Sequence, residues 1–220
     1  MSKKGEERYK VKQFALNGHS RPVKMVKYNK DGDMFFTCSD DKTIIAWSNE
    51  TAEKLGVYEG AVACKAVAVS KKTEYVVGAF VMEGLTIFEA MTGKEVFKFI
   101  PEEGARTEYV ELSFGDKELL VLNTKEGKTK VTIYDFKKLL NKDKKVIKVF
   151  NFPTELTQMS YGYLNEKLYA STKEGKMKII DYDSEDVIVD EKVHPGFEIF
   201  SFTFSKDFSM LASCGKDGTC

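Results

Sequence analysis

A short hydrophobic pattern recurs five times along the chain, with apolar residues at the first, fourth and sixth positions of each copy. The middle residues of successive copies lie 41, 45, 47 and 43 positions apart. One copy could occur in many folds, but a regular spacing of this length indicates a structural repeat. The five copies are Val23/Val26/Tyr28, Cys64/Val67/Val69, Tyr109/Leu112/Phe114, Leu156/Met159/Tyr161 and Ile199/Phe202/Phe204.

Each copy is followed by further short apolar runs that are separated by polar turns. Val, Ile, Phe and Tyr dominate these runs, and no segment sustains the period of an amphipathic helix. Such runs between turn residues are typical of short strands, so each full unit predicts four strands. The expected second strands are Met34–Cys38, Tyr75–Ala79, Leu119–Leu122, Leu168–Ser171 and Met210–Cys214, the third strands are Ile44–Trp47, Leu85–Phe88, Val131–Tyr134 and Met177–Ile180, and the fourth strands include Glu95–Ile100, Val146–Phe150 and Val187–Val193.

The prolines support this division of the chain. Pro22, Pro101, Pro153 and Pro195 each precede a first strand, and no proline falls inside a predicted strand. Proline has no backbone N–H to donate to a β-ladder, so a sheet protein keeps it in connections. Four strands in roughly 40–45 residues is the size of one WD-type propeller blade. The sequence therefore predicts an all-β protein, a WD40-type β-propeller.

The repeat also sets the expected domain boundaries. Residues 1–10 carry charges without an apolar stretch, which favours a disordered tail over a signal peptide. Residues 11–220 form the expected single propeller domain, with blades at about 18–60, 61–101, 102–152, 153–193 and, in part, 194–220.

We expect this propeller to be incomplete and truncated at its C-terminal end. About four and a half blades are present, whereas a closed ring of such repeats usually has about seven. Val11–Leu16 matches the run that supplies the outer strand of the last blade in a closed ring, and the counterpart of Trp47 would fall about three residues beyond Cys220. An open arc would leave sheet faces and strand edges without partners.

The first unit carries residue types that form a hydrogen-bonded chain across a WD blade. His19 precedes the first strand, Thr37 lies in the second, Asp41 lies in the next turn, and Trp47 ends the third. A catalytic histidine would need a nucleophile and an orienting group, and the sequence offers neither. We therefore interpret these residues as structural. His194, Ser213 and Asp217 hold matching places in the fifth unit.

The intervening units lack this set of residues. Phe88, Tyr134 and Ile180 stand at the position of Trp47, and no Gly-His pair opens the second, third or fourth unit. We expect these blades to depend on apolar packing rather than on a polar network.

Composition and motifs narrow the possible functions. Basic and acidic residues number 34 each, so net charge predicts no attraction to nucleic acid or membrane. There is no run of eighteen apolar residues, phosphate-binding glycine loop, metal-ligand cluster or nucleophile elbow. The four cysteines are widely spaced, which suits a reducing compartment. We expect a cytoplasmic protein without catalytic residues, metal or cofactor.

One segment of the third unit is strongly basic and has two interpretations. Five lysines occur among residues 137–145, between the third and fourth predicted strands. The first interpretation is a solvated loop that tolerates insertion. The second is a patch that contacts phosphates of RNA, which would make binding sensitive to salt. The five lysines are Lys137, Lys138, Lys142, Lys144 and Lys145.

The first unit resembles one particular family of WD proteins. Gly-His-x-Arg at residues 18–21 and Tyr-Asn-x-x-Gly-Asp at 28–33 are similar to the first repeat of subunit i of eukaryotic translation initiation factor 3. Residues 53–60, 92–96 and the long insert in the third blade extend the resemblance along nearly the whole chain. The second blade departs from the family, because it lacks Gly-His and reads Ile87-Phe88-Glu89 where a Trp-Asp is usual.

The resemblance implies a function and partners. It implies a scaffold that holds subunits b and g of the factor, on the small ribosomal subunit, and supports pre-initiation complex assembly and scanning. In the family a helix of subunit b lies along the fifth and sixth blades. Asp207 and Asp217, in turns of the fifth blade, are therefore candidate partner-binding residues, although each also has a structural interpretation.

Two other functions stay open at this stage. The pattern is also similar to that of the serine/threonine-kinase-receptor-associated WD adapter, which would place the chain in signalling or RNP assembly. The third possibility is an enzyme or a small-molecule binder. Co-purifying partners would separate the first two functions, and a ligand-dependent thermal shift would indicate the third.

Overall fold

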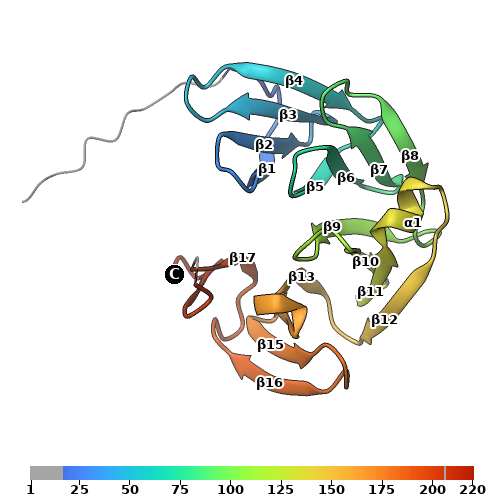
Figure 1. Ribbon diagram of the computed structural model, residues 1–220. Helices are drawn as coiled ribbons and strands as arrows, with labels where there is room; N and C mark the ends of the chain where they lie inside the picture. The colour runs from blue at the N-terminus through green and yellow to red at the C-terminus, as the bar shows by residue number, and fades with distance from the viewer. Residues whose placement is uncertain (1–16, 206) are drawn as a thin grey trace, which may run out of the picture.

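The computed structural model describes residues 17–205 and 207–220. These residues form four four-stranded antiparallel sheets and one two-stranded sheet, which follow one another around an arc in sequence order (Figure 1). The all-β, WD40-type propeller predicted from the sequence is confirmed. The expected tail at 1–10 and the run Val11–Leu16 lie outside the described residues.

The strands within each four-stranded sheet pair in sequence order, from the first strand to the fourth. The second, third and fourth strands of a sheet therefore each pair with the strand before them in the chain. The sheets comprise β1 (Val23–Tyr28), β2 (Met34–Ser39), β3 (Thr43–Ser48) and β4 (Lys54–Glu59); β5 (Cys64–Val69), β6 (Tyr75–Phe80), β7 (Gly84–Glu89) and β8 (Glu95–Phe99); β9 (Arg106–Leu112), β10 (Glu118–Lys125), β11 (Lys128–Asp135) and β12 (Val146–Phe152); β13 (Leu156–Tyr161), β14 (Lys167–Thr172), β15 (Lys176–Asp181) and β16 (Val187–Lys192); and β17 (Ile199–Phe204) with β18 (Leu211–Gly215).

The core lies between neighbouring sheets. Alternate residues of a strand point to opposite faces, so a sheet that packs on both sides must be apolar on both. β6, in the second sheet, is buried from Val76 to Phe80, whereas β1, at one end of the arc, buries none of its six residues. One cluster joins the first two sheets, a larger one joins the second, third and fourth, and a small one joins the fourth to β17 and β18.

Some of the repeated apolar positions are exposed, contrary to a simple reading of the pattern. Val26 and Tyr28 of β1 are 54% and 56% exposed, and Phe114 is 61% exposed. Among the described residues, no sheet packs on the face of the first sheet that points away from the second, which explains the exposure of the β1 residues. Phe114 lies two residues beyond the end of β9, in the turn that leads to β10.

Two short helical segments correct the expectation that the chain contains no helix. The helix α1 (Phe136–Leu140) follows β11, and a single 3-10 turn (Tyr163–Asn165) follows β13. α1 covers little more than one helical turn, which is too short for a hydrophobic period to be visible in the sequence. Its Phe136 and Leu139 are buried, and the Asp135 carboxylate caps its N-terminus by accepting from the backbone N–H of Lys138.

The ends of the strands create two distinct faces of the arc. We call the side that carries the connections from first to second strand and from third to fourth strand the turn face. The opposite side, with the hairpins between second and third strands and the links between sheets, is the hairpin face. The Phe136 N–H donates to the carbonyl of Lys117, which places the start of the lysine-rich segment beside the β9–β10 turn on the turn face.

Candidate protein-docking face

The four residues predicted to form a chain across the first blade are in contact. Trp47 Nε1 donates to Thr37 Oγ1 at 2.8 Å, and Thr37 Oγ1 lies 2.7 Å from His19 Nε2. His19 Nδ1 lies 2.9 Å from Asp41 Oδ2. A Trp N–H can only donate and an ionised carboxylate can only accept, so this order of contacts places the His19 proton on Nδ1. Both imidazole nitrogens are therefore used within the blade.

Hydrogen bonds set the pKa of Asp41. Burial alone would raise it, but bonds from the Thr43 and His19 side chains and from the backbone N–H groups of Ser20 and Thr43 outweigh burial and lower the pKa to about 2. The carboxylate therefore stays charged and holds the imidazole and the following hairpin together.

The corresponding residues of the fifth unit form a similar group on the hairpin face. His194 is buried, its Nδ1 lies 2.9 Å from Asp217 Oδ2, and its Nε2 lies 3.0 Å from Ser213 Oγ. The hydrogen bond from His194 is the main reason that the pKa of Asp217 is lowered. Asp217 is thus engaged inside the chain and lies at the opposite end of β18 from Asp207. The structure does not bring the two predicted partner-binding residues together.

The turn face is built from a repeated loop conformation. In every connection between first and second strands, the fourth residue of the turn has a positive φ angle and its N–H donates to the carbonyl of the first residue. Glycine adopts this conformation easily and a bulky residue does so at a cost, so its recurrence reflects a shared backbone requirement. The five residues are Gly32, Thr73, Asp116, Asn165 and Phe208, with φ angles of 74°, 58°, 55°, 63° and 57°.

Each of these turns contacts the next one along the arc. Three of the four contacts are hydrogen bonds between neighbouring blades, and the fourth is an edge-on contact of two aromatic rings. The turns therefore form one continuous row from the first blade to the fifth. The contacts are Asn29 Nδ2 to Thr73 Oγ1 at 3.1 Å, the Lys71 N–H to Asp116 Oδ2 at 2.7 Å, the Phe114 N–H to Asn165 Oδ1 at 3.0 Å, and the Tyr163 and Phe208 rings with centroids 5.8 Å apart.

Large apolar side chains are exposed along this row. Phe114 and Tyr163 are 61% and 62% exposed, and Leu164 and Phe208 are also exposed. We call these four residues, three of which are aromatic, the aromatic rim. The rim spans turns of the third, fourth and fifth blades, and the Lys71 ammonium lies 5.5 Å from the Phe114 ring centroid at one end. Contiguous exposed aromatic residues flanked by polar groups are typical of protein-interaction surfaces.

Asp207 lies next to Phe208 on the turn face, at the other end of the rim. Its Oδ1 accepts hydrogen bonds from Ser205 Oγ at 2.6 Å, Ser209 N at 3.1 Å and Ser209 Oγ at 2.8 Å. These bonds lower the pKa of Asp207 to about 2, with the bond from Ser205 contributing most. The side chain thus shapes its own turn and also presents a fixed negative charge at the surface.

The lysine-rich segment also lies on the turn face. All five lysines are exposed, whereas Leu139 within the same segment is fully buried. Lys144 Nζ lies 5.3 Å from the ring centroid of Phe99, which holds one lysine against the second sheet. Lys137 and Lys138 belong to α1, whereas Lys142, Lys144 and Lys145 lie in the exposed connection that follows it, so both interpretations of the segment stay open.

Among residues 17–205 and 207–220, no three His, Cys, Asp or Glu side chains gather in a way that could hold a metal ion. No helix in this part of the chain is long and apolar enough to cross a membrane.

Sequence reasoning missed the aromatic rim. Phe114 was assigned to a repeated strand position, and Tyr163, Leu164 and Phe208 were not singled out. The signal that could have identified them is the turn itself, because a large apolar residue in a polar turn has no place in the sheet core.

Comparison with known proteins adds a sequence match and a structural match. Residues 10–48 and 190–220 match the family model of the WD domain, G-beta repeat. Among solved structures, the chain is similar to the β-propeller domain of Cps50 (Swd1) from Myceliophteria thermophila, with a TM-score of 0.71 and 18% identity over 90% of this chain and 63% of that one. At 18% identity, this structural match shows a similar fold and nothing further.

Curated relatives confirm the resemblance found from the first repeat. The chain is 26% identical over 214 residues to eukaryotic translation initiation factor 3 subunit I of Dictyostelium discoideum. It is 24% and 25% identical over 216 residues to the same subunit of Schizosaccharomyces pombe and Homo sapiens. The matches cover 95% of this chain and 63% to 65% of the relatives. The chain is therefore similar to this subunit along nearly all of its own length and spans less than two thirds of the relatives' length.

Proposed function

We propose that this chain is a non-catalytic scaffold of the eukaryotic translation initiation factor 3 complex in the cytoplasm. It would hold subunits b and g of the factor, and so support pre-initiation complex assembly on the small ribosomal subunit and scanning. The observation that carries the proposal is the aromatic rim, on a chain similar over 95% of its length to subunit I of that factor.

The chemistry of the turn face fits a protein partner. Phe114, Tyr163 and Phe208 offer rigid aromatic area with few rotatable bonds, which is the composition of energetic hot spots in interfaces. Asp207, at the end of the rim, would pair with a basic residue of the partner and fix its direction. We assign this surface to subunit b. Asp217 is the weaker candidate because His194 already occupies its carboxylate.

The lysine-rich segment lies on the same side of the arc and would extend the surface towards RNA. Its exposed lysines include Lys137, Lys138, Lys142 and Lys145. Lysines that neutralise RNA phosphates strengthen binding without contacts to specific bases. We propose that this segment strengthens association with the small ribosomal subunit at low salt.

A binding experiment with matched turn variants tests the proposal. Tagged wild-type chain is mixed with purified subunits b and g, and Asp207→Lys is compared with Asp31→Lys. Asp31 is the counterpart of Asp207 in the β1–β2 turn and is also exposed. We expect Asp207→Lys to reduce capture of subunit b at least tenfold and Asp31→Lys to leave it unchanged. Equal capture by all three proteins would contradict the assignment of this surface.

Affinity purification from cells distinguishes the scaffold from the adapter. Recovery of initiation-factor subunits and small-subunit ribosomal proteins is expected. Recovery of a receptor kinase or RNP-assembly proteins, without any initiation-factor subunit, would favour the alternative of an adapter.

A further inference from the structure

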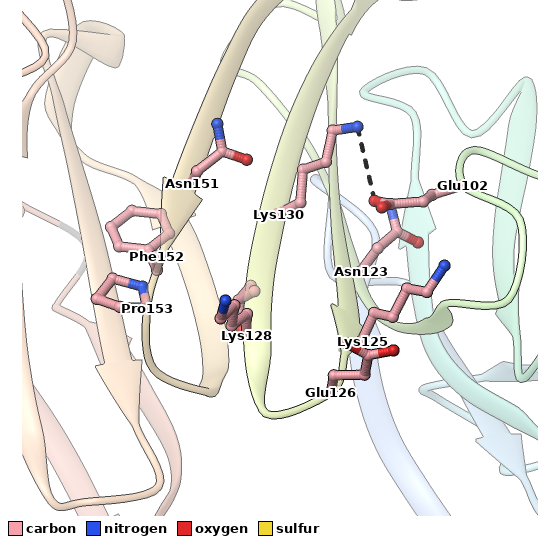
Figure 2. A pocket seen from close by; sticks show the side chains of 10 residues that line it. Glu102, Asn123, Lys125, Glu126, Lys128, Lys130, Asn151, Phe152 and Pro153 are labelled. Carbon is pink, nitrogen blue, oxygen red and sulfur yellow. Dashed lines mark ion pairs between the residues drawn. The ribbon is translucent and has the colours of Figure 1, made fainter.

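A pocket on the hairpin face of the third sheet has the features of a separate binding site. Its volume is about 480 Å³, within the usual range for ligand pockets. Figure 2 shows Asn123 and Lys130 on neighbouring strands, with Glu102 reaching in from the link before β9. Phe152 and Pro153 form the opposite wall. This pocket lies at the other end of the strands from the aromatic rim.

The strand register brings its polar residues together. Asn123 pairs with Lys130, Lys130 pairs with Asn151, and Lys125 pairs with Lys128. Paired residues, and residues two apart on one strand, project from the same face of a sheet. These five side chains therefore share one face of β10, β11 and β12, towards Glu102.

Asn123 has an unused hydrogen-bond donor inside this pocket. The side chain is 1% exposed, and its Oδ1 accepts from Thr107 Oγ1 at 2.9 Å. Its Nδ2 is buried and has no hydrogen-bond partner within residues 17–205 and 207–220. An unpaired buried amide donor costs about 1–3 kcal/mol, so a native protein keeps one where something else supplies the acceptor.

The nearby lysines also lack strong acceptors. Lys125 Nζ donates to the backbone carbonyl of Glu103 at 3.2 Å, and Lys128 is exposed without an ion pair among the described residues. Lys130 Nζ lies 3.7 Å from Glu102 Oε2, which is longer than a hydrogen bond. The pocket therefore offers three ammonium groups and the buried amide donor of Asn123, and its two carboxylates, Glu102 and Glu126, leave it with a net positive charge.

We infer that this pocket binds a carboxylate side chain from an acidic peptide segment of a partner protein. The incoming carboxylate replaces Glu102 beside Lys130 and accepts from Asn123 Nδ2, while Lys125 and Lys128 contact neighbouring acidic residues. RNA fits less well, because Phe152, at 9% exposed, offers no free ring for base stacking. The inference depends on the third sheet alone and does not require the initiation-factor assignment.

Fluorescence anisotropy with a labelled hexaglutamate peptide at low salt tests the site. Lys125→Gln/Lys128→Gln is expected to bind about tenfold more weakly than wild type, because two charge-assisted contacts are lost. Lys54→Gln/Lys94→Gln removes the same charge from exposed positions on the turn face of the first and second sheets, and is expected to bind within about twofold of wild type. Asn123→Asp, checked for folding by its thermal midpoint, is also expected to bind more weakly. Glu102→Gln removes the internal competitor and is expected to bind more tightly.

Three outcomes would overturn the inference. The first is equal weakening by the two double variants, which would mean general charge attraction. The second is a poly(U) RNA that displaces the peptide from the same lysines and binds more tightly than it. The third is inorganic phosphate displacing the peptide as effectively as free glutamate does, which would mean a site for any small anion.

Discussion

The polar side chains of the first blade and those of the third and fourth blades find their hydrogen-bond partners in different ways. In the first blade, Trp47, Thr37, His19 and Asp41 join strands within one sheet. In the third and fourth blades Tyr134 and Ile180 stand in place of Trp47, and a group of side-chain hydrogen bonds joins one sheet to the next. Tyr161 and Tyr182 of the fourth blade both donate to Glu118 of the third, at 3.1 Å and 2.9 Å.

A second group of polar residues extends these links towards the fifth blade. Tyr109 and Ser160, on β9 and β13, both donate to Glu111. Gln158 Nε2 donates to the Phe202 carbonyl of β17, and its Oε1 accepts from the Phe202 N–H, both at 3.1 Å. The third and fourth blades, which lack the Trp–Thr–His–Asp chain, are therefore held in place by hydrogen bonds to neighbouring blades. This arrangement also fixes the relative positions of the three blades that carry the aromatic rim.

The largest expected effect comes from removing Trp47, which both fills space and donates a hydrogen bond. Trp47→Ala should reduce the free energy of unfolding by about 3–5 kcal/mol, as for a large buried aromatic residue. Trp47→Phe keeps most of the packing and loses the donor, so about 1–2 kcal/mol is expected. Urea unfolding measures both. A Trp47→Phe protein as stable as wild type would show that the hydrogen-bonded chain contributes nothing.

The sequence predicted the first blade better than the middle ones, for a physical reason. The apolar repeat and the turn residues identify strands because both signals are local. The His19 network was found because its residues recur at fixed offsets within one unit. The bond between Glu118 and Tyr182 spans 64 residues and has no fixed spacing, so a local pattern could not predict it. The unpaired donor of Asn123 was missed because its lack of a partner depends on residues that only the fold brings around it.

Removing Glu118 is expected to have the next largest effect. Glu118→Ala leaves two tyrosine hydroxyls without their acceptor, and Tyr161 is only 5% exposed. A loss of about 2–4 kcal/mol is expected, since each unpaired buried hydroxyl costs about 1–3 kcal/mol. Glu126→Ala, in the exposed β10–β11 turn, is the control and should change stability by less than about 0.5 kcal/mol. If both variants were equally stable, the links between blades would have no energetic role.

Acid should weaken the first blade specifically. The folded pKa of Asp41, about 2, lies below the usual value of 3.8, so its contribution is present above pH 3.8 and is lost as pH falls towards 2. With allowance for solvent screening, the stability difference between wild type and Asp41→Asn should shrink by about 1–2 kcal/mol between pH 5 and pH 2. A difference that stays constant over this range would contradict the assigned role of Asp41.

High pH should weaken the third and fourth blades, and this is the smallest of the four effects on stability that we expect. Burial, and then the charge of Glu118, raise the pKa of Tyr161 well above 10, so its contribution is complete below pH 10 and declines as pH rises further. At pH 10.5 an unfolded tyrosine of ordinary pKa is mostly deprotonated, which favours unfolding by about 0.8 kcal/mol. The stability advantage of wild type over Tyr161→Phe should therefore fall by about that amount between pH 8 and pH 10.5, as measured by urea unfolding.

Native-state hydrogen exchange, resolved by residue, tests most directly whether the blades are held by two different systems. His19→Ala should accelerate exchange in β1 to β4 and leave β9 to β16 unchanged. Glu118→Ala should accelerate exchange in both the third and the fourth sheets, since its bonds join them. Faster exchange confined to the third sheet in Glu118→Ala, or spread through all sheets in His19→Ala, would contradict this division.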